Sequence, residues 1–201
     1  MRRSLFVNIK MKGILILVVG PSGSGKGSLV AHLKQTHPEV VFPVSCTTRA
    51  PREGEKEGVH FYFVSPEAFD AKAAADEFLE WATYGGNRYG TLKSEIIPAL
   101  DAGKTVVREV EIQGAEHIIQ SLPPENVASI YVDAGSWDNL QKRILARAPM
   151  SEAELALRRD RYEKEILFAT RADVTIQNSD GGLEQAKEAF VAAVEQLRYN
   201  A

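Results

Sequence analysis

The chain has 201 residues, with 27 acidic side chains against 24 Lys and Arg, and a formal net charge of −3. This length allows one α/β domain with a good core and small added lobes, and a second full domain is not expected. The slightly acidic balance argues against a nucleic-acid binder, and the lack of a long apolar run or a signal pattern argues against a membrane or secreted protein. The single cysteine, Cys46, excludes an internal disulfide, so we expect a cytoplasmic protein.

The first twelve residues are basic but lack the apolar stretch of a signal peptide. We expect residues 1–12 to form a flexible N-terminal arm. Because Met11 stands just before the first expected strand, residues 1–10 can be read either as part of the native protein or as an upstream extension of the reading frame.

Residues 20–28 read Gly-Pro-Ser-Gly-Ser-Gly-Lys-Gly-Ser, in which two glycines with four residues between them are followed at once by Lys26. The apolar run Ile14–Val19 is typical of a buried parallel strand, and Leu29 and Leu33 continue beyond the loop at helical spacing. Glycines let backbone N–H groups converge on phosphate oxygens, and the lysine adds positive charge near the β and γ phosphates. The segment predicts an ATP-binding loop made of Gly20, Ser22, Gly23, Ser24, Gly25, Lys26, Gly27 and Ser28.

The residue after the lysine is Gly27, where the general pattern has the hydroxyl that ligates Mg²⁺, and the first hydroxyl comes at Ser28. We therefore expect Mg²⁺ to be held mostly through water. This Gly-Lys-Gly-Ser ending resembles the loops of adenylate kinases and some guanylate kinases, and it favours a nucleoside monophosphate kinase.

Short β-like runs follow the loop helix, separated by turns rich in Arg, Pro and Gly. They predict a small mixed lobe over residues 45–91, inserted between the first and second core strands. The expected strands of this region are Val40–Ser45, Val59–Val64, Phe78–Tyr84 and Asn87–Gly90.

The rest of the chain alternates helical and strand patterns, which predicts a parallel sheet. Pro149 breaks a long helical stretch, with Ser151 as the expected N-cap after it and Glu154 as the capping-box partner. We expect an α/β fold of the P-loop NTPase type, with a three-layer core (13–44, 92–142 and 170–201), the inserted lobe, and a helical lid (143–169). The expected elements are helices near Lys93–Ala102, Gln113–Ser121, Trp137–Ala148, Ser151–Ala169 and Leu183–Leu197, and strands at Thr105–Val110, Val127–Val132 and Val174–Ile176.

Residues 47–55 read Thr-Thr-Arg-Ala-Pro-Arg-Glu-Gly-Glu, and this segment resembles the acceptor-phosphate motif of the guanylate kinase family. The resemblance continues through Glu80-Trp81-Ala82, the run Gly-Asn-Arg-Tyr-Gly-Thr at 86–91, and Ile112-Gln113-Gly114-Ala115 to Asn178. It covers nearly the whole chain beyond residue 12. It implies an enzyme that uses ATP with Mg²⁺ to convert GMP to GDP, as a monomer or homodimer.

Arg49 and Arg52 lie three residues apart on a turn, so both guanidinium groups can reach one small dianion. By the ordinary behaviour of charge runs they would be a surface pair beside Glu53 and Glu55. The resemblance makes them ligands of the acceptor phosphate, with Tyr89 as a third.

The resemblance assigns Glu80 to the acceptor base, with Ser45 and Thr91 as the hydroxyls that complete the base site. A carboxylate opposite guanine accepts from both N1–H and the 2-amino group. Adenine offers neither, and the carboxylate would be left unpaired, which gives selectivity.

Glu109 and Glu111 follow an apolar strand at the end where α/β proteins bind nucleotides, and the period of two places both on one face. The resemblance makes Glu109 the magnesium-side carboxylate, together with Ser28, and Glu111 the acceptor-side carboxylate. Both positions usually hold aspartate in the family.

Arg143, Arg147 and Arg158 lie on the helices around Pro149 and resemble the arginines that a mobile lid brings over the transferring phosphoryl group. They can also be read as a solvated basic face paired with nearby glutamates. Asn178 aligns with a residue near the adenine of the donor nucleotide.

Several positions depart from the family pattern. Phe61 stands where a tyrosine usually binds the acceptor phosphate, and Tyr62 is expected to point to the opposite face of the strand. Arg88 replaces a common tyrosine, and Arg108 lies in an apolar core strand, where a buried arginine needs a carboxylate or backbone partner.

Two other functions stay open at this point. A relative of this fold can phosphorylate another phosphate-bearing acceptor, such as a ribose bisphosphate, and guanylate kinase-like modules of scaffold proteins bind phosphorylated peptides. The base residues argue against the first alternative, and the intact phosphate loop argues against the second.

Overall fold

The computed structural model describes residues 11–147 and 149–199, without the side chains of Tyr84 and Arg147. Residues 1–10 of the predicted arm therefore lie outside the described part of the chain. Met11 and Lys12 are joined to the core, since the Met11 carbonyl accepts from Asn126 Nδ2 at 3.0 Å and the Lys12 N–H donates to the Leu100 carbonyl at 3.2 Å.

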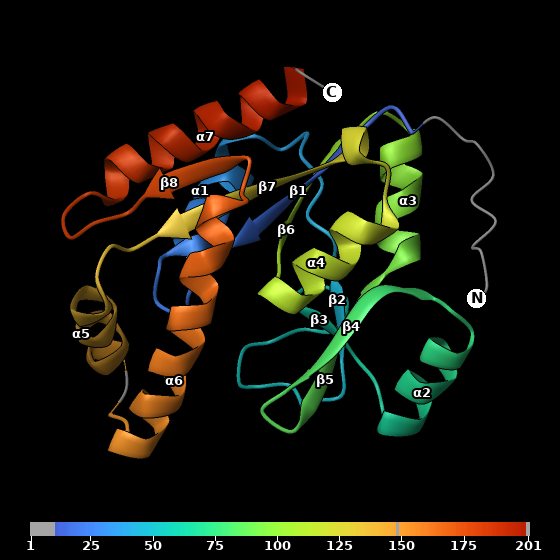
Figure 1. Ribbon diagram of the computed structural model, residues 1–201. Helices are drawn as coiled ribbons and strands as arrows, with labels where there is room; N and C mark the ends of the chain where they lie inside the picture. Colours follow the sequence, from blue (N-terminus) through green and yellow to red (C-terminus); the bar gives the residue numbers. More distant parts are fainter. Residues whose placement is uncertain (1–10, 148, 200–201) are drawn as a thin grey trace.

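Four parallel strands form the core sheet, in the order β6-β1-β7-β8 (Figure 1). Every residue of the first strand is buried, as in sheets that are covered on both faces. The predicted parallel α/β core is confirmed. Its strands are β1 (Ile14–Val19), β6 (Thr105–Glu109), β7 (Val127–Asp133) and β8 (Val174–Gln177).

Helices cover the two faces of this sheet and give three layers. Alternate residues of β1 point to opposite faces, so Ile16 packs with Leu33 and Phe190 on one side, while Leu17 packs with Ile118 on the other. The first side is covered by α1 (Lys26–Thr36) and α7 (Leu183–Tyr199), and the second by α3 (Lys93–Asp101) and α4 (Ile112–Ser121), with the 3₁₀ turn η1 (Pro124–Asn126) leading into β7.

A second, mixed sheet has the strand order β3-β2-β5-β4. The helix α2 (Pro66–Ala74) packs on it through Phe69, which forms a small separate core with Cys46, Phe78 and Leu92. Cys46 is fully buried there. The strands are β2 (Ser45–Thr47), β3 (Phe61–Phe63), β4 (Phe78–Tyr84) and β5 (Asn87–Leu92).

The structure corrects two predictions in this region. Val40–Ser45 is not a strand: only Val41 bridges to the core at Val106, and β2 begins at Ser45. The proline at position 43 has no N–H to donate and interrupts the pairing. The helix α2 was not predicted, although Ser65 caps it by accepting from the Ala68 N–H at 3.2 Å.

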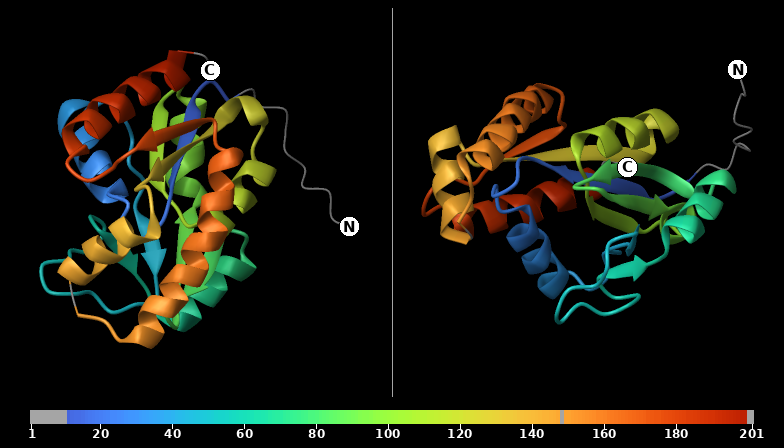
Figure 2. Two further views of the ribbon diagram at one scale, coloured as in Figure 1. Left: turned by 60° about the vertical axis from the view of Figure 1, so that its left-hand side comes forward. Right: turned by 90° about the horizontal axis from the view of Figure 1, so that it is seen from below.

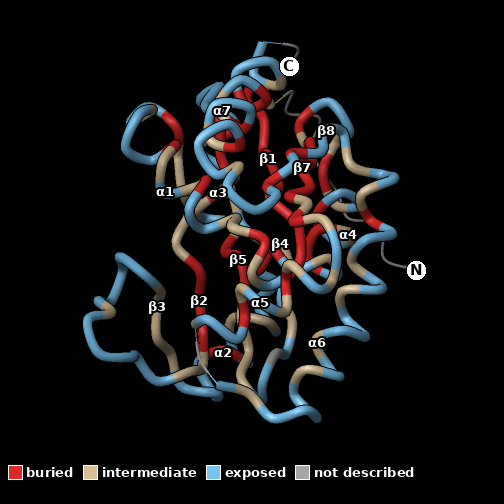
Figure 3. The backbone as a smooth tube through the Cα atoms, turned by 90° about the vertical axis from the view of Figure 1, so that its left-hand side faces the viewer, coloured by how far each residue is buried: buried red, intermediate tan, exposed pale blue. Residues whose placement is uncertain are grey.

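The remaining helices are α5 (Trp137–Arg147) and α6 (Glu152–Glu165), followed by the 3₁₀ segment η2 (Ile166–Thr170). The predicted capping box is confirmed, because Ser151 Oγ accepts from the Glu154 N–H and Glu154 Oε2 accepts from the Ser151 N–H. The predicted helix ends at Glu165 rather than Ala169. These helices and the second sheet extend from the same end of the core (Figure 2). The helix α6 has no buried residue and is much more exposed than the core strands, whereas β2 of the second sheet is buried (Figure 3).

Among the described helices, none combines the length and the apolar character needed to cross a membrane.

Candidate active site

The phosphate loop joins β1 to α1 and depends on its glycines. Gly25 has φ +94°, a conformation that other residues rarely adopt, and a Cβ there would lie 2.3 Å from Asn178 Nδ2. Asn178 in turn donates to the Ser24 carbonyl at 2.6 Å from the end of β8. The predicted donor-site asparagine therefore supports the loop from behind.

Lys26 is held against this loop by two backbone carbonyls. Its Nζ donates to Gly20 at 2.5 Å and to Pro21 at 3.1 Å. Burial lowers the pKa of Lys26, and the charges of Glu109, Glu165 and Glu111 oppose that shift. The loop thus keeps its cation at one fixed place next to acidic side chains.

Two cavities meet at this lysine. One, the loop cavity, is lined mainly by the phosphate loop, Arg143 and the segment after β8. The other, the acceptor cavity, lies between the core and the second sheet and is lined by predicted acceptor residues. Lys26 and Glu109 line both cavities, so these two side chains form their common wall. Of the predicted acceptor residues, those lining the acceptor cavity are Ser45, Glu80, Tyr89 and Glu111.

The register of the second sheet sets up the predicted base site. Ser45 pairs with Thr91 across β2 and β5, and Thr91 pairs with Glu80 across β5 and β4. Cross-strand partners lie side by side on one face, so the three side chains form a row. Thr91 Oγ1 donates to Glu80 Oε1 at 2.5 Å, and a Cβ on Gly114 would lie only 2.9 Å from Glu80 Oε2. The carboxylate is therefore held closely against the first turn of α4.

Arg49 and Arg52 occupy the turn beside the acceptor cavity. Arg49 NH2 donates to both carboxylate oxygens of Glu55, at 2.8 and 3.0 Å, and this contact lowers the pKa of Glu55. Arg52 donates its backbone N–H to the same carboxylate at 2.7 Å, and its side chain is exposed. Neither arginine lines the acceptor cavity: Glu55 and the Ala50 carbonyl hold the Arg49 guanidinium, and the Arg52 side chain is exposed on the turn.

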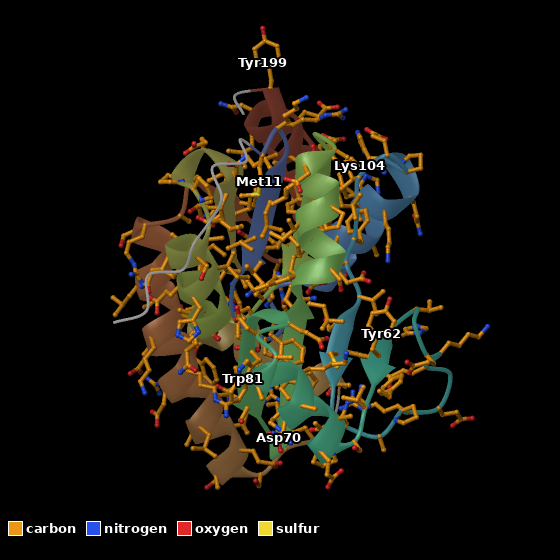
Figure 4. All side chains as sticks on the ribbon, turned by 90° about the vertical axis from the view of Figure 1, so that its right-hand side faces the viewer. Met11, Tyr62, Asp70, Trp81, Lys104 and Tyr199 are labelled. Atoms are coloured by element: carbon orange, nitrogen blue, oxygen red, sulfur yellow. The ribbon has the colours of Figure 1, made fainter. Side chains whose placement is uncertain are left out.

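Phe61 lines the acceptor cavity, with its ring 5.4 Å below the Arg49 guanidinium and edge-on to the Tyr89 ring. Tyr62 points away, as predicted: its hydroxyl donates to Glu95 Oε1 of α3 at 2.9 Å (Figure 4). Tyr62 therefore supplies no hydroxyl to this cavity.

We expect Phe61→Tyr to lower the KM for a phosphate-bearing acceptor by about 10- to 100-fold with little change in kcat, because it adds a hydrogen bond to a charged group. Steady-state kinetics of wild type and variant measure this. Phe63→Tyr adds the same hydroxyl two residues along β3, outside the acceptor cavity, and is the matched control. An equal effect of both substitutions would contradict the role given to position 61.

Glu109 ends β6 and Glu111 is the N-cap residue of α4. A Cβ on Gly27 would lie 3.8 Å from Glu109 Oε1, which places this carboxylate against the phosphate loop. Burial raises the pKa of Glu109, and the charges of Lys26 and Arg108 oppose that shift. Ser28 and Glu109 both line the loop cavity and offer oxygen donors, the kind that Mg²⁺ prefers.

The lid arginines reach the phosphate loop and its surroundings. Arg158 NH1 donates to Ser22 Oγ at 2.8 Å. Arg143 NH2 donates to the Asn178 carbonyl at 2.8 Å and to Asp180 Oδ1 at 3.0 Å. Arg147 ends α5, and its side chain lies outside the described residues. The alternative reading paired these arginines with Glu152, Glu154 or Glu163, but the side-chain hydrogen bonds of Arg143 and Arg158 go to Asn178, Asp180 and Ser22.

A third cavity, the lid cavity, lies between the phosphate loop and α6 and includes Ser22, Glu111, Arg158 and Glu165. Burial and the charge of Glu111 raise the pKa of Glu165 to about 7, while Lys26 and Arg161 act in the other direction. This carboxyl group therefore titrates near neutral pH.

A raised carboxyl pKa means that the folded protein holds a proton that the unfolded chain releases. Between pH about 4.5 and about 7 the free energy of unfolding should therefore fall as pH rises. We expect Glu165→Gln to remove this slope and to be more stable than wild type at pH 8. Urea unfolding from pH 5 to 8 measures it, with the exposed Glu163→Gln as control. Parallel profiles for wild type and Glu165→Gln would contradict the assignment.

Sequence reasoning missed several residues of this site. Arg108 contacts the base row, Glu55 holds Arg49, and Asp180 holds Arg143. Glu55 was visible within the arginine motif, and a buried cation such as Arg108 signals an unidentified partner. Arg88, by contrast, binds Asp70 and the Pro66 carbonyl of α2 and ties that helix to β5.

Comparison with known proteins gives a consistent result. The guanylate kinase family profile matches residues 12–197. A guanylate kinase of Thermosynechococcus vestitus is 42% identical over 182 residues, covering 90% of this chain and 93% of the relative. One from Streptomyces coelicolor is 39% identical over 165 residues, covering 82% and 83% of the two chains.

A solved structure agrees with these sequences. The crystal structure of guanylate kinase from Anaplasma phagocytophilum superposes with a TM-score of 0.72 at 26% identity, covering 94% of this chain and 88% of that one. The chain belongs to the guanylate kinase family of nucleoside monophosphate kinases.

Proposed function

We propose that this protein transfers the γ-phosphoryl group of ATP to GMP, giving ADP and GDP. The observation that carries the proposal is the common wall of the loop and acceptor cavities, formed by Lys26 and Glu109. A triphosphate bound by the loop would meet an acceptor phosphate across these two side chains. Family membership supports the same reaction.

We propose that GMP binds in the acceptor cavity. Glu80 accepts from N1–H and the 2-amino group of guanine, and Ser45 completes the base site, while the buried Thr91 lies outside the cavity and holds the Glu80 carboxylate. The acceptor phosphate lies toward the turn, where Arg49, Arg52 and Tyr89 hold it and Glu111 borders it. Residues 45–91 act as the acceptor lobe in this proposal.

ATP binds in the loop cavity, with its phosphates on the backbone N–H groups of residues 20–28 and on Lys26, and with Asn178 supporting the loop. Bound Mg²⁺ would neutralise charge on the phosphates. Glu109 and Ser28 are placed to hold it, in part through water. Phosphate oxygens of the nucleotide would supply the remaining oxygen ligands that Mg²⁺ prefers.

Catalysis then rests on positioning and on neutralising charge. Lys26 and the lid arginines Arg143, Arg147 and Arg158 surround the transferring group once the lid, residues 143–169, closes and excludes water. The acceptor is a phosphate whose second pKa is about 6, so it is largely ionised at neutral pH and needs no general base. We place this activity in the cytoplasm.

The test is release of ADP from MgATP with GMP, dGMP, AMP, UMP and ribose 1,5-bisphosphate as separate acceptors. We expect turnover with GMP well above that with AMP or UMP. Turnover only with ribose 1,5-bisphosphate would overturn the base assignment of Glu80. ATP binding without turnover on any acceptor would overturn the kinase and favour a phosphopeptide-binding role.

A further inference from the structure

Arg108 lies in the core strand β6, between Glu109 and the buried Val107. It follows the buried pair Val106 and Val107 in β6, and only 11% of its side chain is exposed. It lies on the same side of the strand as Val106, which packs in the layer toward α3 and α4. From there its guanidinium reaches the second sheet and lines the acceptor cavity.

The contacts of this guanidinium are with the row of proposed base residues. Arg108 NH1 donates to Ser45 Oγ at 2.6 Å, and Nε donates to Thr91 Oγ1 at 2.7 Å. NH2 lies 3.9 Å from Glu80 Oε1. One side chain of the core therefore touches all three members of the row.

These contacts determine where the hydroxyl hydrogens point. A guanidinium has donors and no acceptor, so both hydroxyl oxygens must accept from Arg108. Thr91 sends its own hydrogen to Glu80 Oε1 at 2.5 Å. Ser45 has no acceptor for its hydrogen among the described residues and lines the acceptor cavity, so its O–H is free to donate into that cavity.

The wall of the cavity then offers a donor at Ser45 beside an acceptor at Glu80. A 6-oxopurine matches this order, because its O6 accepts and its N1–H donates. A 6-aminopurine reverses both groups and would face a donor with a donor and an acceptor with an acceptor, which leaves buried polar groups unpaired. The order of donor and acceptor distinguishes the two purine classes before the 2-amino group is considered.

We propose that Arg108 is a specificity-determining positioning residue: it holds the Ser45 and Thr91 hydroxyls as acceptors and so directs the Ser45 hydrogen toward O6 of the acceptor base. This rests on the proposed binding of GMP in the acceptor cavity. Because Arg108 acts through the 6-oxo side, it should matter equally for GMP and IMP, which differ only in the 2-amino group.

The test measures kcat/KM of wild type, Arg108→Met and Arg108→Lys with GMP, IMP and AMP. We expect Arg108→Met to lower kcat/KM for GMP and IMP by the same factor, about 10- to 100-fold, with AMP unchanged or improved. The change should lie in the KM for the acceptor, with the KM for ATP unaffected. Arg108→Lys, which keeps donors and charge, should restore part of the preference.

A double-mutant cycle makes the role of the hydroxyl explicit. In the Ser45→Ala background, Arg108→Met should have little further effect on the ratio of GMP to AMP. If Arg108→Met does not fold, Ser45→Ala alone must lower the GMP-to-AMP and IMP-to-AMP ratios of kcat/KM by the same factor. An equal loss for all three nucleotides, or an unchanged ratio, overturns the proposal. Absence of GMP turnover in wild type would instead count against the proposed function, and in that case equilibrium binding of GMP, IMP and AMP to the same variants decides the role of Arg108.

Discussion

Replacing Lys26 with alanine is expected to lower kcat by about 10²- to 10³-fold or more, since it removes a preorganised cation from the place where charge develops. Lys26 stands in the common wall of the loop and acceptor cavities, so its ammonium group is close to both the donor and the acceptor phosphates in the proposed complex. Binding of GMP should change much less, because the base row and the arginine turn remain in place.

The matched control is Lys104→Ala. Lys104 lies just before β6, at the end of the core away from the second sheet (Figure 4), and its side chain is exposed. Steady-state kinetics for both variants, with far-UV circular dichroism to check the fold, make the measurement. A Lys26→Ala enzyme with kcat within about threefold of wild type would show that the loop positions phosphate through its backbone alone.

The second large effect is expected at the base site. We expect Glu80→Gln to lower kcat/KM for GMP by about 10²- to 10³-fold, because an amide can accept from one of the two guanine donors and opposes the other with its own NH₂. The loss should be smaller for IMP, which has only the N1–H donor. AMP, whose N1 accepts, should gain in relative terms.

Glu77→Gln makes the same substitution three residues earlier, where the carboxylate binds Lys72 on the surface. It should leave all three acceptors unchanged. A similar factor for GMP, IMP and AMP in Glu80→Gln would mean that Glu80 supports the lobe rather than reads the base.

The most accurate predictions from the sequence concern elements whose determining residues are close together in the chain. The phosphate loop is a local motif, and β1 runs from Ile14 to Val19 as expected because an unbroken apolar run needs a covered sheet on both faces. The capping box at Ser151 and Glu154 is equally local. The helix α2 was missed because only Phe69 of its nine residues is buried, so its apolar periodicity is weak.

Long-range contacts were harder to predict. Arg108 and Ser45 lie 63 positions apart, and neither residue alone indicates that one donates to the other. The resemblance to a family identified the members of the base row, but their hydrogen-bond directions depend on a core strand that no local pattern links to the second sheet. The pairing of Arg143 with Asp180 is of the same kind, 37 positions apart.

Gly114 limits how this protein can be redesigned. The smallest possible addition there, one methyl group, would come within 2.9 Å of the Glu80 carboxylate. Since the side chain of Glu80 can yield more easily than backbone, the addition would move the carboxylate rather than unfold the helix. In a mutant library that varies only position 80 to obtain a new acceptor base, the new side chain must still fit against the backbone at Gly114. Shorter side chains at 80 open room for larger residues at 114, so the two codons are best randomised together.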